Sequence, residues 1–203
     1  KLQFGPVKFI VDGSIQGFTA RLRAPGYAGG QPNGLWLIPP SQLPALFEPF
    51  HLAGLQLHIH TNGDEATEVV LDVIEDLLAR HPRADHRHTL QHCQLASSAQ
   101  LQRAARLGMC VNFFSNHLYY WGDAHAEQTV GMQWASRMNA AGTARRLGMD
   151  FAMHSDAPIT PIHPLFTAWC AVQRETASGR VLGEAERLSV DDALHAITMG
   201  AAR

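Results

Sequence analysis

The chain has 203 residues, of which 46% are hydrophobic and 17% are charged, which is typical of a globular protein with a sizeable core. The formal net charge is −2 and basic residues form no run, which argues against a nucleic-acid partner. No apolar stretch reaches the roughly 20 residues of a membrane-spanning helix, so no membrane partner is expected. The widely spaced Cys93, Cys110 and Cys170 argue against a disulfide framework and predict a reducing, cytoplasmic location. We therefore expect a small-molecule partner, and a homo-oligomer is compatible with this composition.

An apolar run near the N-terminus predicts a buried strand over residues 6–11, ended by Gly13. Successive side chains of a strand point to opposite faces, so Lys8 and Asp12 would share the face opposite the apolar residues. Lys8 is one of two lysines in the chain. The Gly- and Pro-rich residues 13–40 that follow predict a long loop that is either functional or disordered.

The second predicted strand covers residues 55–60, where apolar and polar residues alternate and place His58 and His60 on one face. Residues 62–64, Asn-Gly-Asp, end this strand and offer an N-cap for the next helix. Two imidazoles at a strand end suit a metal site on the following loop, but two histidines packed in an ordinary sheet fit the same pattern. From these residues alone both interpretations stay open.

Alternating strands and helices are predicted for the rest of the chain. Further strands are expected over residues 87–92, 109–114 and 150–155. Helices are expected over residues 41–53 with Ser41 as cap, 64–81, 98–107, 139–147 and 163–178, and after Ser189, which forms a capping box with Asp192. Residues 115–136 form an aromatic and polar stretch without a predicted element. A helix end, a glycine and a strand start recur at Gly54, Gly108 and Gly148, as at the junctions of a parallel α/β fold. The pattern fits a doubly wound sheet or part of a (β/α)8 barrel.

Residues suited to catalysis gather at the predicted strand ends, because Lys8, His60, His92 and Asp156 each lie at or near the C-terminal end of a different strand. The loops that follow parallel strands converge at one edge of the sheet, so these side chains can meet. Histidine and aspartate suit a divalent ion, which lowers the pKa of a bound water to about 7, and an aspartate beside it can accept the proton. Each residue alone has an ordinary structural explanation, but the joint pattern favours a metal site.

Four ordered motifs resemble the amidohydrolase superfamily. They are KFIVDGS at 8–14, HTNGDEA at 60–66, QHCQL at 91–95 and SDAP at 155–158. The resemblance is strongest to amidohydrolase family 3, the group of YtcJ-like proteins and N-substituted formamide deformylases. It implies an α/β fold, a metal-dependent hydrolase (β/α)8 TIM barrel, of which residues 1–203 would form the C-terminal part with its fourth to eighth strands.

The resemblance also implies a role for each site residue. Lys8 would be the fourth-strand lysine, carboxylated on its amine and bridging two metals. His60 and His92 would be the metal ligands of the fifth and sixth strands. Asp156 would be the eighth-strand metal ligand and the general base. The expected cofactor is a divalent metal, with zinc preferred, as one or two ions.

The loop at residues 116–125 resembles the seventh-strand loop of this family, which faces the pocket. His117 would contact substrate, and Tyr120 and Trp121 would wall the pocket. A packed aromatic loop over the barrel mouth explains these residues equally well.

Two departures from the family pattern stand out. Relatives often carry glutamate at the position of Gln91, so the local charge differs here. The first-strand His-x-His pair is missing, and we do not assign His58 and His60 to it because their surroundings match the fifth strand.

These features predict a hydrolase that cleaves a carbon–nitrogen bond of a small non-peptide amide by metal-activated water. The alternative is a non-catalytic binding or regulatory protein, or an inactive fragment that keeps the barrel pocket. The missing first-strand ligands favour the alternative for this chain alone. The joint presence of Lys8, His60, His92 and Asp156 favours the enzyme, because a binding protein does not need the whole set.

Overall fold

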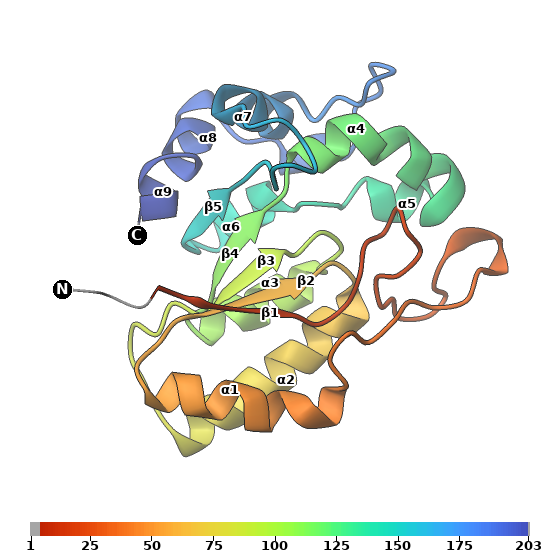
Figure 1. Cartoon of the computed structure of the whole chain (residues 1–203). Helices are drawn as coiled ribbons and strands as arrows, with labels where there is room; N and C mark the ends of the chain where they lie inside the picture. Colours follow the sequence, from red (N-terminus) through yellow and green to blue (C-terminus); the bar gives the residue numbers. More distant parts are fainter. Residues whose placement is uncertain (1–4, 203) are drawn as a thin grey trace.

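A computed structural model describes residues 5–202 and contains a parallel sheet of five strands among them (Figure 1). The strands are β1 (Val7–Ile10), β2 (Leu57–Thr61), β3 (Thr89–His92), β4 (Cys110–Phe113) and β5 (Phe151–Met153). Their order in space is their order in the chain, and all neighbours are parallel. A doubly wound sheet reverses its strand order at a switch point, so this unbroken order supports the barrel segment. The predicted strands and their parallel arrangement are confirmed.

The helices follow the strands in alternation, with extra helices before and after β5. They are α1 (Leu43–Leu52), α2 (Asp64–Arg80), α3 (Ser98–Arg106), α4 (Asn116–Ala124), α5 (Met132–Ala135), α6 (Ala141–Arg146), α7 (Pro164–Gln173), α8 (Val190–Ala196) and α9 (Met199–Ala202). Short 3-10 turns cover Ala28–Gly30, Pro40–Gln42 and Glu184–Glu186, and a π-helix covers His125–Thr129. Within residues 5–202, no helix combines the length and the apolar character needed to cross a membrane.

The two faces of the sheet differ in chemistry. One face is apolar and packs under the helices, with β-strand side chains Phe9, Leu57, Ile59, Leu90, Val111 and Phe113 in a single buried cluster with helix residues. The other face, which we call the inward face, carries Lys8, His58, His60, Gln91 and Asn112. This alternation follows from the period of two along each strand. Helices on one face and polar groups on the other are the arrangement of a barrel wall.

A second apolar cluster forms beyond the strand ends. It joins the segment 13–40 to residues 118–138 after β4 and to Leu182 after α7, through Ile15, Leu22, Tyr27, Leu118, Met138 and Leu182 among others. The segment 13–40 is therefore folded onto the protein. Figure 1 shows it extending from β1 toward the α4–α5 side of the molecule.

Two predictions for the helices were wrong. The first concerns Ser41, which lies inside the turn Pro40–Gln42, whereas α1 begins after Gln42 without a side-chain cap. The N-cap of α2 is Gly63, within the predicted residues 62–64, but it makes no side-chain cap hydrogen bond, and the Asp64 carboxylate accepts the Arg23 N–H at 3.0 Å.

The second error concerns the stretch 115–136, which is largely helical. In α4 the polar residues Asn116 and His117 are buried beside Leu118, so no apolar stripe marks the helix.

Two predictions for the C-terminal part of the chain agree with the structure. Ser189 Oγ accepts the Asp192 N–H at 3.1 Å as expected, and the helix at 163–178 exists as α7 but ends earlier, where Arg174 turns left-handed at φ 54°.

Candidate metal centre

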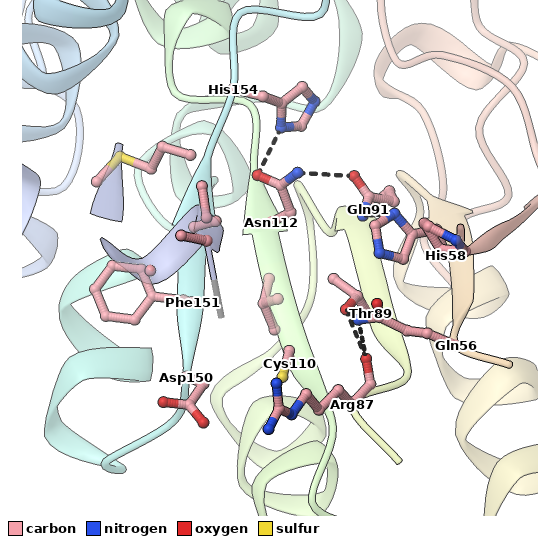
Figure 2. Close-up of a pocket in the computed structure, with 17 residues that line it drawn as sticks. Gln56, His58, Arg87, Thr89, Gln91, Cys110, Asn112, Asp150, Phe151 and His154 are labelled. Carbon is pink, nitrogen blue, oxygen red and sulfur yellow. Dashed lines mark hydrogen bonds between the residues drawn. The ribbon is translucent and has the colours of Figure 1, made fainter. Parts of the chain in front are cut away.

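The inward face of the sheet forms a polar surface that leads to the strand ends (Figure 2). His60, Gln91 and Asn112 stand side by side in register on β2, β3 and β4. Figure 2 shows His154, just beyond β5, continuing this row from Asn112. The hollow along this face has a volume of about 430 Å³.

His92 reaches the strand ends through a local change of backbone. Its register partners Thr61 and Phe113 face the helices, so an ordinary strand would send the imidazole the same way. His92 and Cys93 instead adopt left-handed angles, φ 64° and φ 48°. The His92 ring thereby meets the His60 ring, with centroids 4.5 Å apart.

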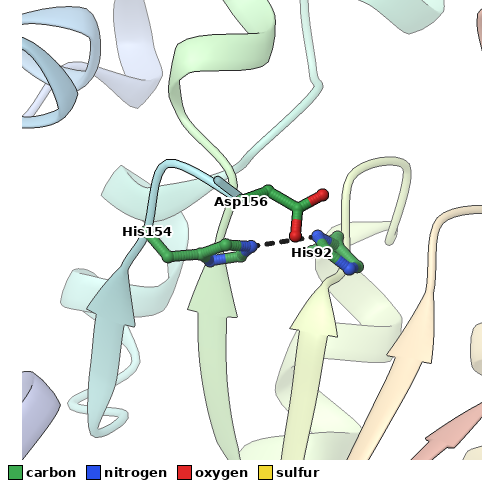
Figure 3. A group of neighbouring side chains, drawn as sticks. All are labelled: His92, His154 and Asp156. Carbon is green, nitrogen blue, oxygen red and sulfur yellow. Dashed lines mark hydrogen bonds between the residues drawn. The ribbon is translucent and has the colours of Figure 1, made fainter. Parts of the chain in front are cut away.

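His92, His154 and Asp156 form a cluster that could hold a metal ion (Figure 3). One ligand atom from each lies within 4.8 Å of the other two, and His154 Nε2 is 3.0 Å from His92 Nδ1. Asp156 also has a left-handed backbone, φ 52°. His154 was not among the predicted site residues, although its place two residues before Asp156 on a strand was a usable signal.

The protonation states suit metal binding. Burial lowers the pKa of His60 to about 4 and that of His154 to about 3, and it holds the pKa of His92 well below its usual range. These imidazoles are therefore neutral at pH 7 and each offers a lone pair. Burial raises the pKa of Asp156, while the charge of Lys8 opposes this increase.

Lys8 lies on the inward face, in register with His58. The residue is exposed, but partial burial of its amine lowers its pKa and the Asp156 carboxylate opposes that shift. The Lys8 charge also lowers the pKa of His60 and His92, so the amine lies near the same group of side chains. Its carboxylation and its role as a ligand remain predictions.

Asp12 is a buried carboxylate whose positioning role sequence reasoning missed. It accepts backbone N–H groups from Arg21 at 3.0 Å, Asn62 at 2.9 Å and Gly63 at 2.8 Å. Burial still raises the pKa of Asp12 to about 7. Its Oδ1 lies 3.7 Å from His60 Nε2, so Asp12 joins three chain segments directly beside a candidate ligand.

A cavity of about 340 Å³ opens beside this cluster, lined by His60, His92, Asp156, His117 and Gln16 among others. His117 Nε2 donates to Gln16 Oε1 at 3.0 Å, and its Nδ1 lies 3.1 Å from His125 Nε2 in the π-helix. His117 is therefore placed in the cavity wall.

The two other predicted substrate residues lie elsewhere. Trp121 packs against His117, with ring centroids 4.6 Å apart, and is not part of the cavity lining. Tyr120 lines a separate hollow of about 220 Å³ with Pro161, His163 and Phe166. Their contact with substrate remains a prediction.

A sequence profile of the amidohydrolase family matches residues 1–203. The chain belongs to the amidohydrolase family. Two solved structures share the fold of this amidohydrolase chain, both titled as uncharacterized metal-dependent hydrolases. The Pyrococcus horikoshii OT3 protein has a TM-score of 0.85 at 26% identity, with 98% of this chain and 40% of that chain covered. The Pyrococcus furiosus protein has a TM-score of 0.82 at 25% identity, with 98% and 39% covered.

Curated relatives of this amidohydrolase chain are considerably longer. YtcJ of Bacillus subtilis, an amidohydrolase by name, is 29% identical over 99% of this chain and 38% of its own length. LONG AFTER FAR-RED 3 of Arabidopsis thaliana is 30% identical over 100% of this chain and 35% of its own length. N-substituted formamide deformylase of Arthrobacter pascens is 30% identical over 73% of this chain and 27% of its own length. The chain thus spans less than two-fifths of each of these relatives.

Proposed function

We propose that this chain supplies part of the active site of a metal-dependent hydrolase that cleaves the carbon–nitrogen bond of a small non-peptide amide. The observation that carries the proposal is the meeting of His60, His92, His154 and Asp156 at the ends of the strands. The name of the Arthrobacter relative, an N-substituted formamide deformylase, indicates the class of amide to test first. The cysteine pattern supports a cytoplasmic location as part of the proposal.

The residues present fit a divalent metal. His92, His154 and Asp156 offer ligand atoms within 4.8 Å of one another, and imidazole with carboxylate is a donor set that zinc accepts. His60 adjoins this group, and a carboxylated Lys8 would add oxygen ligands. A zinc ion held there would supply a water molecule with a pKa of about 7 and polarise an amide carbonyl.

The protein side chains would supply the remaining chemistry. Asp156 would accept the proton of the attacking water and deliver it to the leaving nitrogen. The His117 Nε2–H now donates to Gln16, and it could donate to a substrate carbonyl in the same cavity. A volume of about 340 Å³ lies in the range of pockets that hold small molecules.

The test uses the intact protein, with zinc content measured by plasma mass spectrometry and formate release measured on a panel of N-substituted formamides. We expect stoichiometric zinc, turnover that stops on chelation and returns with zinc, and loss of both metal and turnover in His92→Asn. Other small amides would be tested in parallel, with release of the amine as the signal.

Zinc binding without turnover of any amide in the panel would contradict the proposal and favour the binding protein. Turnover that survives complete removal of metal would contradict the metal-dependent mechanism.

A further inference from the structure

A chain of hydrogen bonds crosses the inward face from β2 to the end of β5. Gln91 Nε2 donates to His58 Nδ1 at 3.0 Å, and Asn112 Nδ2 donates to Gln91 Oε1 at 3.0 Å. Asn112 Oδ1 lies 3.0 Å from His154 Nδ1. Figure 2 shows Asn112 between its two partners, with one amide atom directed to each. Every strand from β2 to β4 thus contributes one side chain to this polar chain.

The direction of this polar chain determines which nitrogen of His154 carries the proton. Asn112 uses its amide N–H toward Gln91, so only its oxygen faces His154. An oxygen acceptor requires a donor, so His154 Nδ1 is protonated. A neutral imidazole has one N–H, which leaves a lone pair on Nε2. That Nε2 is the atom found 3.0 Å from His92 Nδ1 in the metal cluster.

We propose that His154 is a metal ligand through Nε2, and that Asn112, Gln91 and His58 are positioning residues that hold it in the ligating tautomer. The inference rests on the proposed metal-dependent function. Histidines that bind metals usually donate their other N–H to an acceptor, which is the role of Asn112 here. Two nitrogens bound to one tetrahedral zinc lie about 3.3 Å apart, close to the separation of the His92 and His154 nitrogens.

Gln91 acquires a specific role in this scheme. Its amide accepts from Asn112 at one end and donates to His58 at the other, so it links two neighbours without a charge. An ionised glutamate at this position could accept at both ends but could not donate to His58. The glutamine is therefore matched to the neutral polar chain that ends at His154.

The first test reads the tautomer directly. Intact protein labelled with ¹⁵N in histidine would be studied by long-range ¹H–¹⁵N spectra with and without zinc, and His154 would be assigned from His154→Gln. We expect a protonated Nδ1 and an unprotonated Nε2 in both forms, with the Nε2 signal moving when zinc is added. A protonated Nε2 in the zinc-loaded protein would overturn the inference.

The second test measures zinc affinity by competition with a chromophoric chelator. Asn112→Leu should weaken zinc binding by about 10–100-fold, the usual effect of losing the hydrogen-bonded partner of a ligand. His154→Gln, which removes the ligand itself, should weaken zinc binding at least as much. Asn112→Asp keeps an acceptor toward His154 and should retain near wild-type affinity. Thr89→Val is the matched control, because Thr89 lies on the same face of β3 as Gln91 but outside the polar chain.

The outcomes separate this inference from the proposed function. If the wild-type protein binds zinc and both His154→Gln and Asn112→Leu bind it equally well, the inference fails and the proposed function stands. A wild-type protein with no affinity for zinc would overturn both. If circular dichroism shows that Asn112→Leu does not fold, two other measurements decide the question. They are the zinc affinity of Gln91→Leu and the tautomer of His154 in the wild-type protein.

Discussion

Two residues turn their backbones left-handed at the point where their side chains must enter the site. His92 and Asp156 have φ 64° and φ 52°, and neither is glycine. Such angles are uncommon for residues with a Cβ and cost free energy, so they persist where the surrounding structure enforces them. Here both turns bring a ligand-type side chain to the same cluster.

Asp156 is expected to be the proton shuttle of the intact enzyme. Asp156→Asn keeps the shape and one oxygen but cannot accept the proton, so kcat should fall by roughly 10²–10⁴ with little effect on folding. The measurement is kcat together with zinc content. A fall of less than about tenfold at unchanged zinc content would exclude Asp156 as the base, whereas lost zinc would assign it mainly as a ligand.

A separate histidine group lies at the opposite end of the strands and involves no candidate ligand. His88 Nδ1 accepts the Leu57 N–H at 3.1 Å and its Nε2 lies 2.8 Å from His51 Nδ1. His86 Nδ1 accepts the His88 N–H at 3.0 Å. Each of these acceptor Nδ1 atoms needs a lone pair, so the two hydrogen bonds require His86 and His88 to be neutral.

This group should make stability depend on pH. Burial, reinforced by His86, His51 and Arg83, lowers the pKa of His88 to about 2, against about 6.5 in the unfolded chain. Below pH 6.5 the unfolded state therefore binds a proton that the folded state does not. The free energy of unfolding should fall by about 1.4 kcal/mol per pH unit for this residue alone, and the contribution is fully present above pH 6.5.

The measurement is urea unfolding of the wild type and His88→Gln between pH 7.5 and 4.5. The variant cannot titrate at this position, so its stability should decline less steeply as the pH falls. Two curves with equal slopes would show that His88 does not take up a proton on unfolding.

At the scale of elements, the segment 13–40 is held against the end of β2 by very close backbone packing. A Cβ added to Gly63 would lie 1.8 Å from the Arg21 carbonyl oxygen, although φ at Gly63 is −82° and suits any residue. Residue 63 therefore has to be glycine because there is no space for a Cβ atom, and not because of its backbone conformation. The same contact brings the Gly63 N–H to Asp12.

Gly63→Ala should separate the two segments and cost about 1–3 kcal/mol of stability, the usual range for overpacking, or more if the backbone cannot move. Gly5→Ala is the control, because no atom lies within 4 Å of the added Cβ. Equal unfolding midpoints in urea for the two variants would contradict the packing argument.

The elements that could be predicted from the sequence are those in which apolar and polar residues alternate with a simple period. The period-two pattern located β2 and the direction of His60, and the same reasoning applied to β5 would have found His154. The direction of the His92 side chain could not be predicted, because it depends on a left-handed backbone angle that breaks the alternation of side chains along β3. The helix α4 was missed because its buried face carries Asn116 and His117.

At the scale of the whole molecule, β1 and β5 each have a neighbour on one side only among the described residues. On the paired side of β1, the Val7 N–H donates to the carbonyl of Gln56, just before β2, and the Val11 N–H donates to the carbonyl of His60 in β2. Ile10 of β1 is 46% exposed. The inward face is likewise open along a hollow of about 430 Å³. In a closed barrel both edges and this face would be covered.

Hydrogen exchange should reveal these edges. In a chain of residues 1–203, amides of β1 and β5 should exchange faster than those of β3, which is paired on both sides. Mass spectrometry of peptic peptides would compare the strands. Slower exchange in β1 than in β3 would indicate that another surface covers the edge.

The separation of the two apolar clusters has an evolutionary consequence. One cluster joins the sheet to its helices, and the other joins the segment 13–40 to the residues after β4, with no shared member. A substitution at Leu22 or Met138 would act first on the cluster that contains Ile15 and Leu118, the chain neighbours of Gln16 and His117 in the cavity wall. Mutation in this cluster therefore offers a route to new substrate preferences that changes no side chain in the cluster beneath the strands.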